Sequence, residues 1–295
     1  MTTDTKCILA IGNFDGVHRG HAALLAHARE IAGRMPLHAL TFEPHPRQFF
    51  KPDGAPFRIT PRDQKIRRLK ALTDDIRVLD FNAGLAAMSA ASFIDDIVIR
   101  GMNAAHVVVG QDFHFGHGRT GNVATLKSDG RFDVTPVMLV ADDLAVISST
   151  RIRQALHDGN IVDANAMLGW DWAIEGTVVH GDKRGREIGF PTANIWLDDT
   201  VSPAHGVYAV LVDTGDGVWR PGAANIGLRP MFVLPKPLLE VYLLDFDGDL
   251  YGKTLAVRPV RFLRSEAKYE GLDALRSQIA KDCAQARDIL KSPAL

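Results

Sequence analysis

The chain is poor in cysteine and nearly balanced in charge. Its 295 residues include two cysteines, Cys7 and Cys283, which lie near opposite ends of the sequence. Two distant cysteines exclude a disulfide framework and the paired spacing of a cysteine metal site. Lys and Arg total 34 against 35 for Asp and Glu, which gives a formal net charge of -1. No broad electrostatic attraction to nucleic acid or to a membrane surface is therefore expected.

Long hydrophobic runs are absent as well. No stretch of about 18 consecutive apolar residues occurs, and the first residues do not combine a basic and an apolar region as a signal peptide would. The sequence therefore predicts a soluble, cytoplasmic protein whose partners are small-molecule substrates, with no nucleic acid and no membrane among them. It leaves open whether the chain forms a homo-oligomer.

The P-loop motif G-x-x-x-x-G-K-[ST] is also missing, so an ATP-using enzyme with this sequence would bind the nucleotide in another way. Gly116 to Gly121 do satisfy G-x-G-x-x-G, which would favour a nicotinamide-dependent oxidoreductase. In a dinucleotide site the first glycine ends the strand, whereas here the residues Gly110 to Phe115 follow the apolar run that ends at Val109. We interpret the match as accidental.

The hydrophobic pattern predicts two different halves. From Cys7 to about Leu156, short apolar runs alternate with helical patterns. This alternation predicts βαβ units in a doubly wound parallel sheet, with ligands bound at the carboxyl ends of the strands. One of the expected strands is Val137 to Val140.

The second half is rich in strand-like runs separated by turns, which predict antiparallel hairpins. Apolar residues then recur at helical spacing from Leu272 to Leu290. The expected fold class is α/β plus β. Residues 1–168 form the doubly wound domain, and residues 169–295 form a small antiparallel β-barrel with a terminal helix.

The most informative segment runs from Gly12 to His21 (GNFDGVHRGH), directly after an apolar strand. His18 and His21 stand three residues apart, so they share one face of a helix that begins here. The free N–H groups and the positive dipole end of a helix N-terminus attract phosphate. The segment therefore predicts a nucleotide-phosphate site.

Three more clusters follow later strands of the first half. Phe42 to Pro46 (FEPHP) offers an aromatic ring and an imidazole on which a planar ligand could stack, and Gly110 to Gly116 (GQDFHFG) carries further aromatic and carboxylate groups. Ile147 to Arg153 (ISSTRIR) combines hydroxyl groups at a helix start with two arginines, Arg151 and Arg153. Either guanidinium could neutralise the charge of a leaving pyrophosphate.

In the second half, Gly176 to Asn194 (GTVVHGDKRGREIGFPTAN) joins a strand, a basic glycine-rich loop and a Pro-Thr-Ala-Asn segment. Such a loop can surround phosphates with backbone N–H groups. Thr192 and Asn194 are alternate residues, so on an extended segment their oxygens face the same side. Mg²⁺ accepts neutral oxygen ligands together with substrate phosphates.

In order and spacing, the four clusters of the first half resemble the adenylyltransferase half of the bacterial bifunctional riboflavin kinase/FAD synthetase family, and H-x-G-H resembles the signature of nucleotidylyltransferases. The resemblance implies a nucleotidylyltransferase-like domain that transfers the adenylyl group of ATP to FMN, giving FAD and pyrophosphate. It implies catalytic roles for His18, His21 and Arg153. The implied ATP contacts are Gly12, Asn13, Phe14, Asp15, Gly20, Ser149 and Thr150, and the implied flavin contacts are Phe42, His45, Asp112 and Phe115.

The second half resembles the riboflavin kinase domain of the same family, through the segment from Gly176 to Asn194 and through NIGLRP (residues 225–230) and DFDGDLYG (residues 245–252). The resemblance implies phosphorylation of riboflavin by ATP, with Glu240 as the general base. It implies Mg²⁺ ligands at Thr192 and Asn194, ATP contacts at Gly181, Lys183, Gly185 and Gly189, and a flavin contact at Arg229.

Two alternatives stay open at this point. The leading interpretation is a bifunctional enzyme, but the chain departs from the family pattern at Trp170, Asp171 and Met231, which leaves open a monofunctional FAD synthetase with a weak or inactive kinase half. A non-catalytic flavin-binding sensor would keep the pockets and lose turnover. The intact histidine, metal-ligand and general-base positions argue against the sensor.

Overall fold

The computed structural model describes residues 5–181, 185, 189–197, 199–229 and 236–291. Packing divides the chain into two units, Met1–Ala55 with Thr60–Ser149 and Pro56–Ile59 with Thr150–Leu295. Packing does not decide where the functional domains begin, so the predicted boundary after residue 168 stays a prediction. Among the described residues, no helix is long and apolar enough to cross a membrane.

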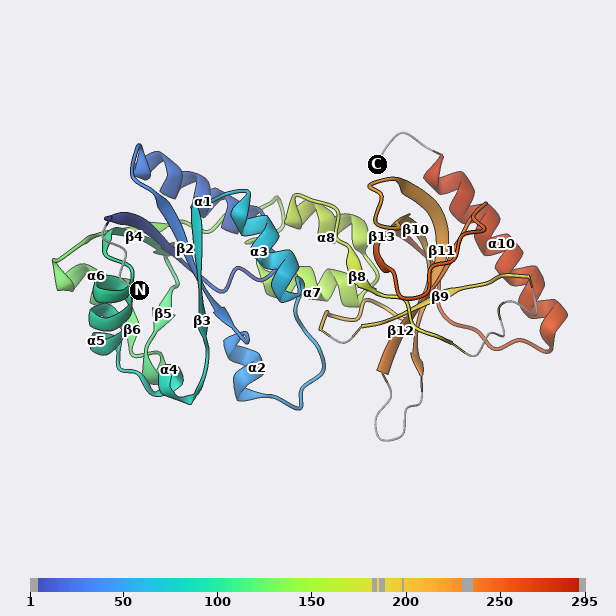
Figure 1. Ribbon diagram of the computed structural model, residues 1–295, viewed down its shortest axis with the longest axis horizontal. Coiled ribbons are helices and arrows are strands. Elements are labelled where there is room, and N and C mark those ends of the chain that lie inside the picture. Colours follow the sequence, from blue (N-terminus) through green and yellow to red (C-terminus); the bar gives the residue numbers. More distant parts are fainter. Residues whose placement is uncertain (1–4, 182–184, 186–188, 198, 230–235, 292–295) are drawn as a thin grey trace. The chain divides into compact units, whose positions relative to one another are not determined.

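The first unit is built on a five-stranded sheet whose strand order is β3-β2-β1-β4-β7, and every pairing in it is parallel (Figure 1). Its strands are β1 (Cys7–Ile11), β2 (Leu37–Glu43), β3 (Asp75–Asp80), β4 (Ala104–Gly110) and β7 (Asp133–Val137). Its helices are α1 (Arg19–Ala32), α2 (Pro46–Phe50), α3 (Arg62–Lys70), α4 (Ala83–Ala87), α5 (Ala90–Ser92), the π-helix η1 (Phe93–Gly101) and α6 (Val123–Asp129). The order reverses between β1 and β4, which is where sheets of this kind bind ligands.

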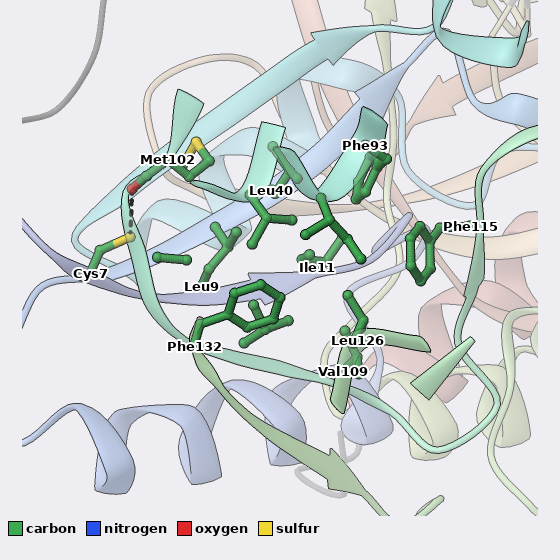
Figure 2. Close-up of a cluster of buried hydrophobic side chains, with 14 of the residues drawn as sticks. Cys7, Leu9, Ile11, Leu40, Phe93, Met102, Val109, Phe115, Leu126 and Phe132 are labelled. Carbon is green, nitrogen blue, oxygen red and sulfur yellow. Dashed lines mark hydrogen bonds between the residues drawn. The ribbon is translucent and has the colours of Figure 1, made fainter. Parts of the chain in front are cut away.

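Both faces of this sheet are covered, as a parallel sheet requires. Alternate residues of β1 point to opposite faces: Leu9 and Ile11 join one buried cluster, whereas Ile8 and Ala10 join the other. Figure 2 shows the first cluster, in which Leu9 and Ile11 lie among side chains from several elements, and Cys7 Sγ donates a hydrogen bond to the Met102 carbonyl. These faces explain the near-continuous apolar runs of the central strands.

The strand expected at Val137 to Val140 is wrong in position, because the observed strand β7 ends at Val137. β7 lies at the edge of the sheet and contains Pro136, which an edge strand tolerates because it needs no ladder hydrogen bond on its outer side. The apolar run that suggested a strand is largely exposed instead, and Met138 is 78% exposed.

The second unit begins with two helices, α7 (Ser149–His157), whose first residue belongs to the first unit, and α8 (Ile161–Leu168). Six antiparallel strands follow in the order β8-β13-β10-β11-β12-β9. They are β8 (Ile174–Thr177), β9 (Ala193–Trp196), β10 (Gly206–Asp213), β11 (Trp219–Arg229), β12 (Lys236–Leu243) and β13 (Thr254–Arg264). A bridge between Val179 and Asn194 links the two edges, so the sheet is nearly a closed barrel.

Helix α10 (Leu272–Leu290) packs on β10 and β11 of this barrel (Figure 1). Cys283 and Ala286 of the helix are buried against Ala209 and Ala223 of those strands. The α/β plus β fold class and the terminal helix predicted from the sequence are therefore confirmed.

A short segment from the first half of the sequence, Pro56–Ile59, is built into the second unit. The Trp172 indole N–H donates to the Ile59 carbonyl at 2.8 Å, and the backbone N–H of Val201 donates to the Arg58 carbonyl at 2.7 Å. Trp172 is fully buried. The second unit is therefore discontinuous in sequence.

The G-x-G-x-x-G match lies on a small hairpin formed by β5 (His114–Phe115) and β6 (Gly121–Asn122), with a 3-10 turn, η2 (His117–Arg119), between them. Packing accounts for two of its glycines. A Cβ atom at Gly116 would lie 2.7 Å from the Ala90 backbone nitrogen, and one at Gly121 would lie 2.7 Å from the Phe115 ring. The motif is therefore not the turn between a strand and a helix that a dinucleotide site requires.

This packing predicts unequal costs for two alanine substitutions in the motif. Gly116→Ala adds a close backbone contact to a positive φ of 74°, whereas Gly118→Ala at φ 62° meets nothing closer than 4.0 Å. We expect Gly118→Ala to lower the free energy of unfolding by about 1–2 kcal/mol and Gly116→Ala by a further ~1–3 kcal/mol. Urea unfolding of both variants measures this, and equal losses would contradict the packing explanation.

Candidate active sites

The first candidate site is the loop between β1 and α1, at the point where the strand order reverses. The chain turns sharply there, with positive φ at Phe14, Gly16 and Val17. Thr60 holds the turn: its backbone N–H donates to the Asp15 carboxylate at 3.2 Å, and its hydroxyl oxygen accepts from the Gly16 N–H at 3.0 Å. The loop is therefore preorganised by the protein.

Ser149, the first residue of α7, supports the same loop by donating from its hydroxyl to the Asp15 carbonyl at 2.8 Å. Gly12 and Gly20 lie where larger residues would crowd aromatic rings, since a Cβ atom would come within 3.1 Å of Phe14 and of His18, respectively. Much of the ATP site predicted for the first half, from Gly12 to Gly20 with Ser149, thus gathers around one turn.

His18 and His21 stand together at the start of α1. His18 is the N-cap residue, and its Nδ1 accepts a hydrogen bond from the His21 backbone N–H at 3.4 Å. This contact orients the ring and leaves Nε2 as the protonated nitrogen of a neutral His18. The two imidazole rings are stacked with centroids 3.7 Å apart, and Phe14 meets the His21 ring edge-on at 5.3 Å.

His21 is held as a neutral ring. Its burial, reinforced by His18 and Lys65, lowers the pKa of His21 well below 6.5. Its Nδ1 is buried and has no hydrogen-bond partner in the described part of the chain. Together with the free N–H groups at the start of α1, this ring can donate to an anion without carrying a charge of its own.

A lysine that the sequence did not single out is buried near this loop. Lys65 of α3 is 2% exposed and pairs with Glu43 at 2.5 Å. Its Nζ also donates to the carbonyls of Phe42 at 3.1 Å and of Asn13 at 3.4 Å. The available signal was its position four residues before Leu69, on the helix face that Leu69 buries.

The predicted flavin residues of the first half occupy different environments. The Phe42 ring is mostly buried and meets Phe81 edge-on at 6.0 Å. His45 caps α2, where its Nδ1 accepts from the Arg47 N–H at 3.1 Å.

The remaining two predicted flavin residues follow β4. Asp112 is exposed, and its carbonyl lies 2.8 Å from His114 Nδ1. Phe115 is a core residue that packs between Phe93 and Phe113.

Thr150 and Arg153 of α7 belong to the second unit. There the Arg153 Nε donates to the Phe57 carbonyl at 2.8 Å, and the guanidinium lies 5.1 Å from the centre of the Phe57 ring. The predicted role of Arg153 toward pyrophosphate stays a prediction.

The second candidate site lies on the barrel, where strand register aligns three polar residues. Glu240 of β12 is paired directly with Asn194 of β9 on one side and with Asn225 of β11 on the other. Directly opposed residues in an antiparallel sheet point to the same face with Cβ atoms about 4.5–5.5 Å apart. The predicted general base and a predicted metal ligand therefore share one face.

Asn194 fits the role of an oxygen ligand. The residue is 6% exposed, its Nδ2 donates to the Thr192 carbonyl at 3.4 Å, and its Oδ1 is buried with no hydrogen-bond partner among the described residues. In the same part of the chain, no cluster of three His, Cys, Asp or Glu side chains could hold a metal ion. Neutral oxygens completed by substrate phosphates are the donor set that suits Mg²⁺.

The predicted ATP loop passes close to this amide. A Cβ atom at Gly181 would lie 2.5 Å from Asn194 Nδ2, and one at Gly185 would lie 2.4 Å from the Phe190 carbonyl oxygen. Gly189 has a positive φ of 83°. Lys183 and Met231 lie outside the described residues, and for Arg229 only the backbone, at the end of β11, is described.

Comparison with known proteins matches both units. A family described as FAD synthetase matches residues 1–151, and a family described as riboflavin kinase matches residues 168–290. A solved structure from Streptococcus pneumoniae, described as a macrolide-efflux protein, is 34% identical, covers 97% of this chain and 95% of its own, and superposes with a TM-score of 0.88. The macrolide-efflux description applies to the Streptococcus pneumoniae protein. The structural similarity extends over both folds of this chain.

Curated relatives from several bacteria carry the name bifunctional riboflavin kinase/FMN adenylyltransferase. The Escherichia coli K12 protein is 43% identical over 96% of this chain and 92% of its own length. The Pseudomonas fluorescens and Bacillus subtilis proteins are 42% and 39% identical, each over 95% of this chain and 92% of their own. The chain belongs to the family of bifunctional riboflavin kinase/FMN adenylyltransferases.

Proposed function

We propose that the protein makes FAD in two steps, each with its own ATP. The second unit phosphorylates riboflavin to FMN, and the first unit transfers an adenylyl group to FMN. The observation that carries this proposal is that each unit has its own group of polar residues whose chemistry suits phosphates. They are the stacked histidines at the start of α1 and the Asn194–Glu240 pair on the barrel.

In the adenylyl transfer, a phosphate oxygen of FMN attacks the α-phosphorus of ATP. The bond from that phosphorus to the oxygen bridging the α and β positions breaks, and pyrophosphate leaves. The nucleophile is already ionised near neutral pH, so no general base is needed and catalysis consists of positioning and charge stabilisation. His18 and His21 donate to the phosphates.

The kinase reaction differs because its nucleophile is a hydroxyl group. The 5′-hydroxyl oxygen of riboflavin attacks the γ-phosphorus, the bond to the oxygen bridging the β and γ positions breaks, and ADP leaves. Glu240 accepts the hydroxyl proton. Its position opposite Asn194 supports this role, because the base must lie beside the metal-bound phosphates.

Mg²⁺ would be held by Thr192 and Asn194, with the phosphates of ATP completing its coordination. When bound, the ion neutralises charge that develops on the transferred phosphoryl group. The orphaned Oδ1 of Asn194 supports this assignment. ATP is the co-substrate and FMN and FAD are the products of the two activities.

The alternatives receive less support. A monofunctional FAD synthetase or a non-catalytic sensor would not need a buried amide oxygen without a partner beside an aligned carboxylate, and the described part of the barrel has both. The oxidoreductase alternative depended on the G-x-G-x-x-G match, which the β5–β6 hairpin explains.

His21→Ala is expected to lower kcat for FAD formation from FMN by about 100-fold or more, because removal of one preorganised donor costs that much. FMN formation from riboflavin by the same protein should stay within twofold, since it uses the other unit. His27→Ala is the matched control, because His27 lies on the same helix with its side chain 46% exposed. Chromatography of the flavins measures both products, and loss of both activities in a folded His21→Ala protein would contradict separate sites.

Glu240→Gln is expected to have the opposite effect. The amide keeps the size of the side chain but cannot accept the proton, so FMN formation should fall by roughly 10²–10⁴-fold while FAD formation from added FMN is retained. Glu175→Gln makes the same change on strand β8 of the barrel and serves as the control. A Glu240→Gln protein with wild-type kinase turnover would exclude Glu240 as the base.

Asn194→Ala is expected to raise the Mg²⁺ concentration that gives half-maximal FMN formation by about tenfold or more, because it removes an oxygen ligand. The Mg²⁺ dependence of FAD formation from FMN is the internal control and should not change. Titration of Mg²⁺ at saturating ATP measures both dependences. An unchanged requirement in the kinase assay would show that Asn194 does not hold the ion.

A further inference from the structure

The buried Lys65–Glu43 pair has no role in the two reactions as described so far. Lys65 is 2% exposed, and its partner Glu43 has a side chain that is 10% exposed. Burying a lysine and a carboxylate is costly, and apolar residues of similar size often stabilise a core equally well. Stability alone therefore does not explain a charged pair at this position.

Its location relates it to the adenylyl-transfer site. Asn13 follows β1 in the histidine-bearing loop, and Phe42 is near the end of β2, the strand paired with β1. One ammonium group donates to both carbonyls, at 3.4 and 3.1 Å, and so joins the loop to the neighbouring strand end. Thr41 adds a second tie to the loop, with its hydroxyl donating to the Asn13 carbonyl at 3.1 Å.

An ammonium group at the end of a long side chain suits this connection from the helix. The three donors of an ammonium group suit three acceptors at once, here the Glu43 carboxylate and the two carbonyls. Glu43 balances the charge and lies beside Phe42 in sequence, so the same pair restrains the strand end that carries the Phe42 ring.

We propose that Lys65 is a positioning residue for adenylyl transfer: by tying the Asn13 and Phe42 carbonyls together, it fixes the histidine-bearing loop against the strand end that presents Phe42. This inference rests on the proposed adenylyl transfer in the first unit. Lys65 acts through the loop and does not touch the reacting phosphates. A displacement of about 1 Å at a reacting centre can cost 100-fold in rate, so the tie is expected to affect kcat more than KM.

The test is Lys65→Met/Glu43→Gln, which removes the tie without leaving a buried charge unpaired. We expect kcat for FAD formation from FMN to fall by about 30-fold or more, with KM for ATP changed less than threefold and FMN formation from riboflavin unchanged. Lys70→Met, an exposed lysine on the same helix, is the control. Wild-type kcat in the folded double variant would overturn the proposal.

A second readout separates positioning from general destabilisation. Among the described residues, the groups that act electrostatically on His21 are His18, from the loop before α1, and Lys65, from α3. The positive charge of Lys65 lowers the pKa of His21, so NMR titration should find a higher pKa for His21 in the double variant than in Glu43→Gln alone, which keeps the lysine charge. An unchanged pKa would mean that Lys65 does not lie against this site.

Lys65→Arg takes the place of the double variant if the latter loses the fold of the first unit. It keeps a cation beside Glu43, but the planar guanidinium cannot reproduce the bonds of a single ammonium group. We expect kcat for FAD formation to fall at least tenfold, and wild-type kcat would overturn the proposal. If the folded wild-type protein makes no FAD from FMN, the proposed adenylyl transfer itself is wrong. If the wild type makes FAD and the variant does so at the same rate, only the positioning role of Lys65 is wrong.

Discussion

The pairing of β1 with β2 on one side and β4 on the other is the constraint on which the first site depends. Because all three strands are parallel, the loops that follow them meet at one edge of the sheet, and the reversal of strand order leaves room there for a ligand. The loop after β1 leads into α1, so the free N–H groups of that helix are directed to the same place. This arrangement fixes the positions of His18, which is the N-cap residue, and of His21, which lies one turn later.

In the second unit, strand register alone brings the candidate site residues together. Antiparallel pairing places Asn194, Glu240 and Asn225 in one row across three strands. A shift of one residue in any of these pairings would send a side chain of the row to the opposite face of the barrel. The apolar neighbours Ile195, Leu239 and Val241 are buried on the other face and thereby hold the register. The chemistry of the kinase half thus depends on core residues that take no part in it.

The sequence predicted more of the candidate site residues than of the residues and strands that hold them in place. The spacing of His18 and His21, the glycines of both loops and the change from α/β to β texture are local patterns, so one sequence is enough to recognise them. Lys65 was missed because the stretch Arg62–Lys70 is highly charged and is typical of an exposed helix. Its burial depends on tertiary contacts, with the Asn13 and Phe42 carbonyls and the Glu43 carboxylate, that a local pattern does not reveal. The edge strand β7 was predicted too late in the sequence. Its own residues are mostly half-exposed, whereas the residues that follow it form the apolar run that predicted a strand.

The most direct test of two sequential activities is a time course of the purified full chain with riboflavin, ATP and Mg²⁺, in which the flavins are separated by chromatography. Two independent sites predict that FMN appears first and FAD follows, with pyrophosphate released in step with FAD. Unchanged riboflavin together with FAD formed from added FMN would contradict the kinase half of the account. No conversion of either flavin by folded protein would contradict both halves.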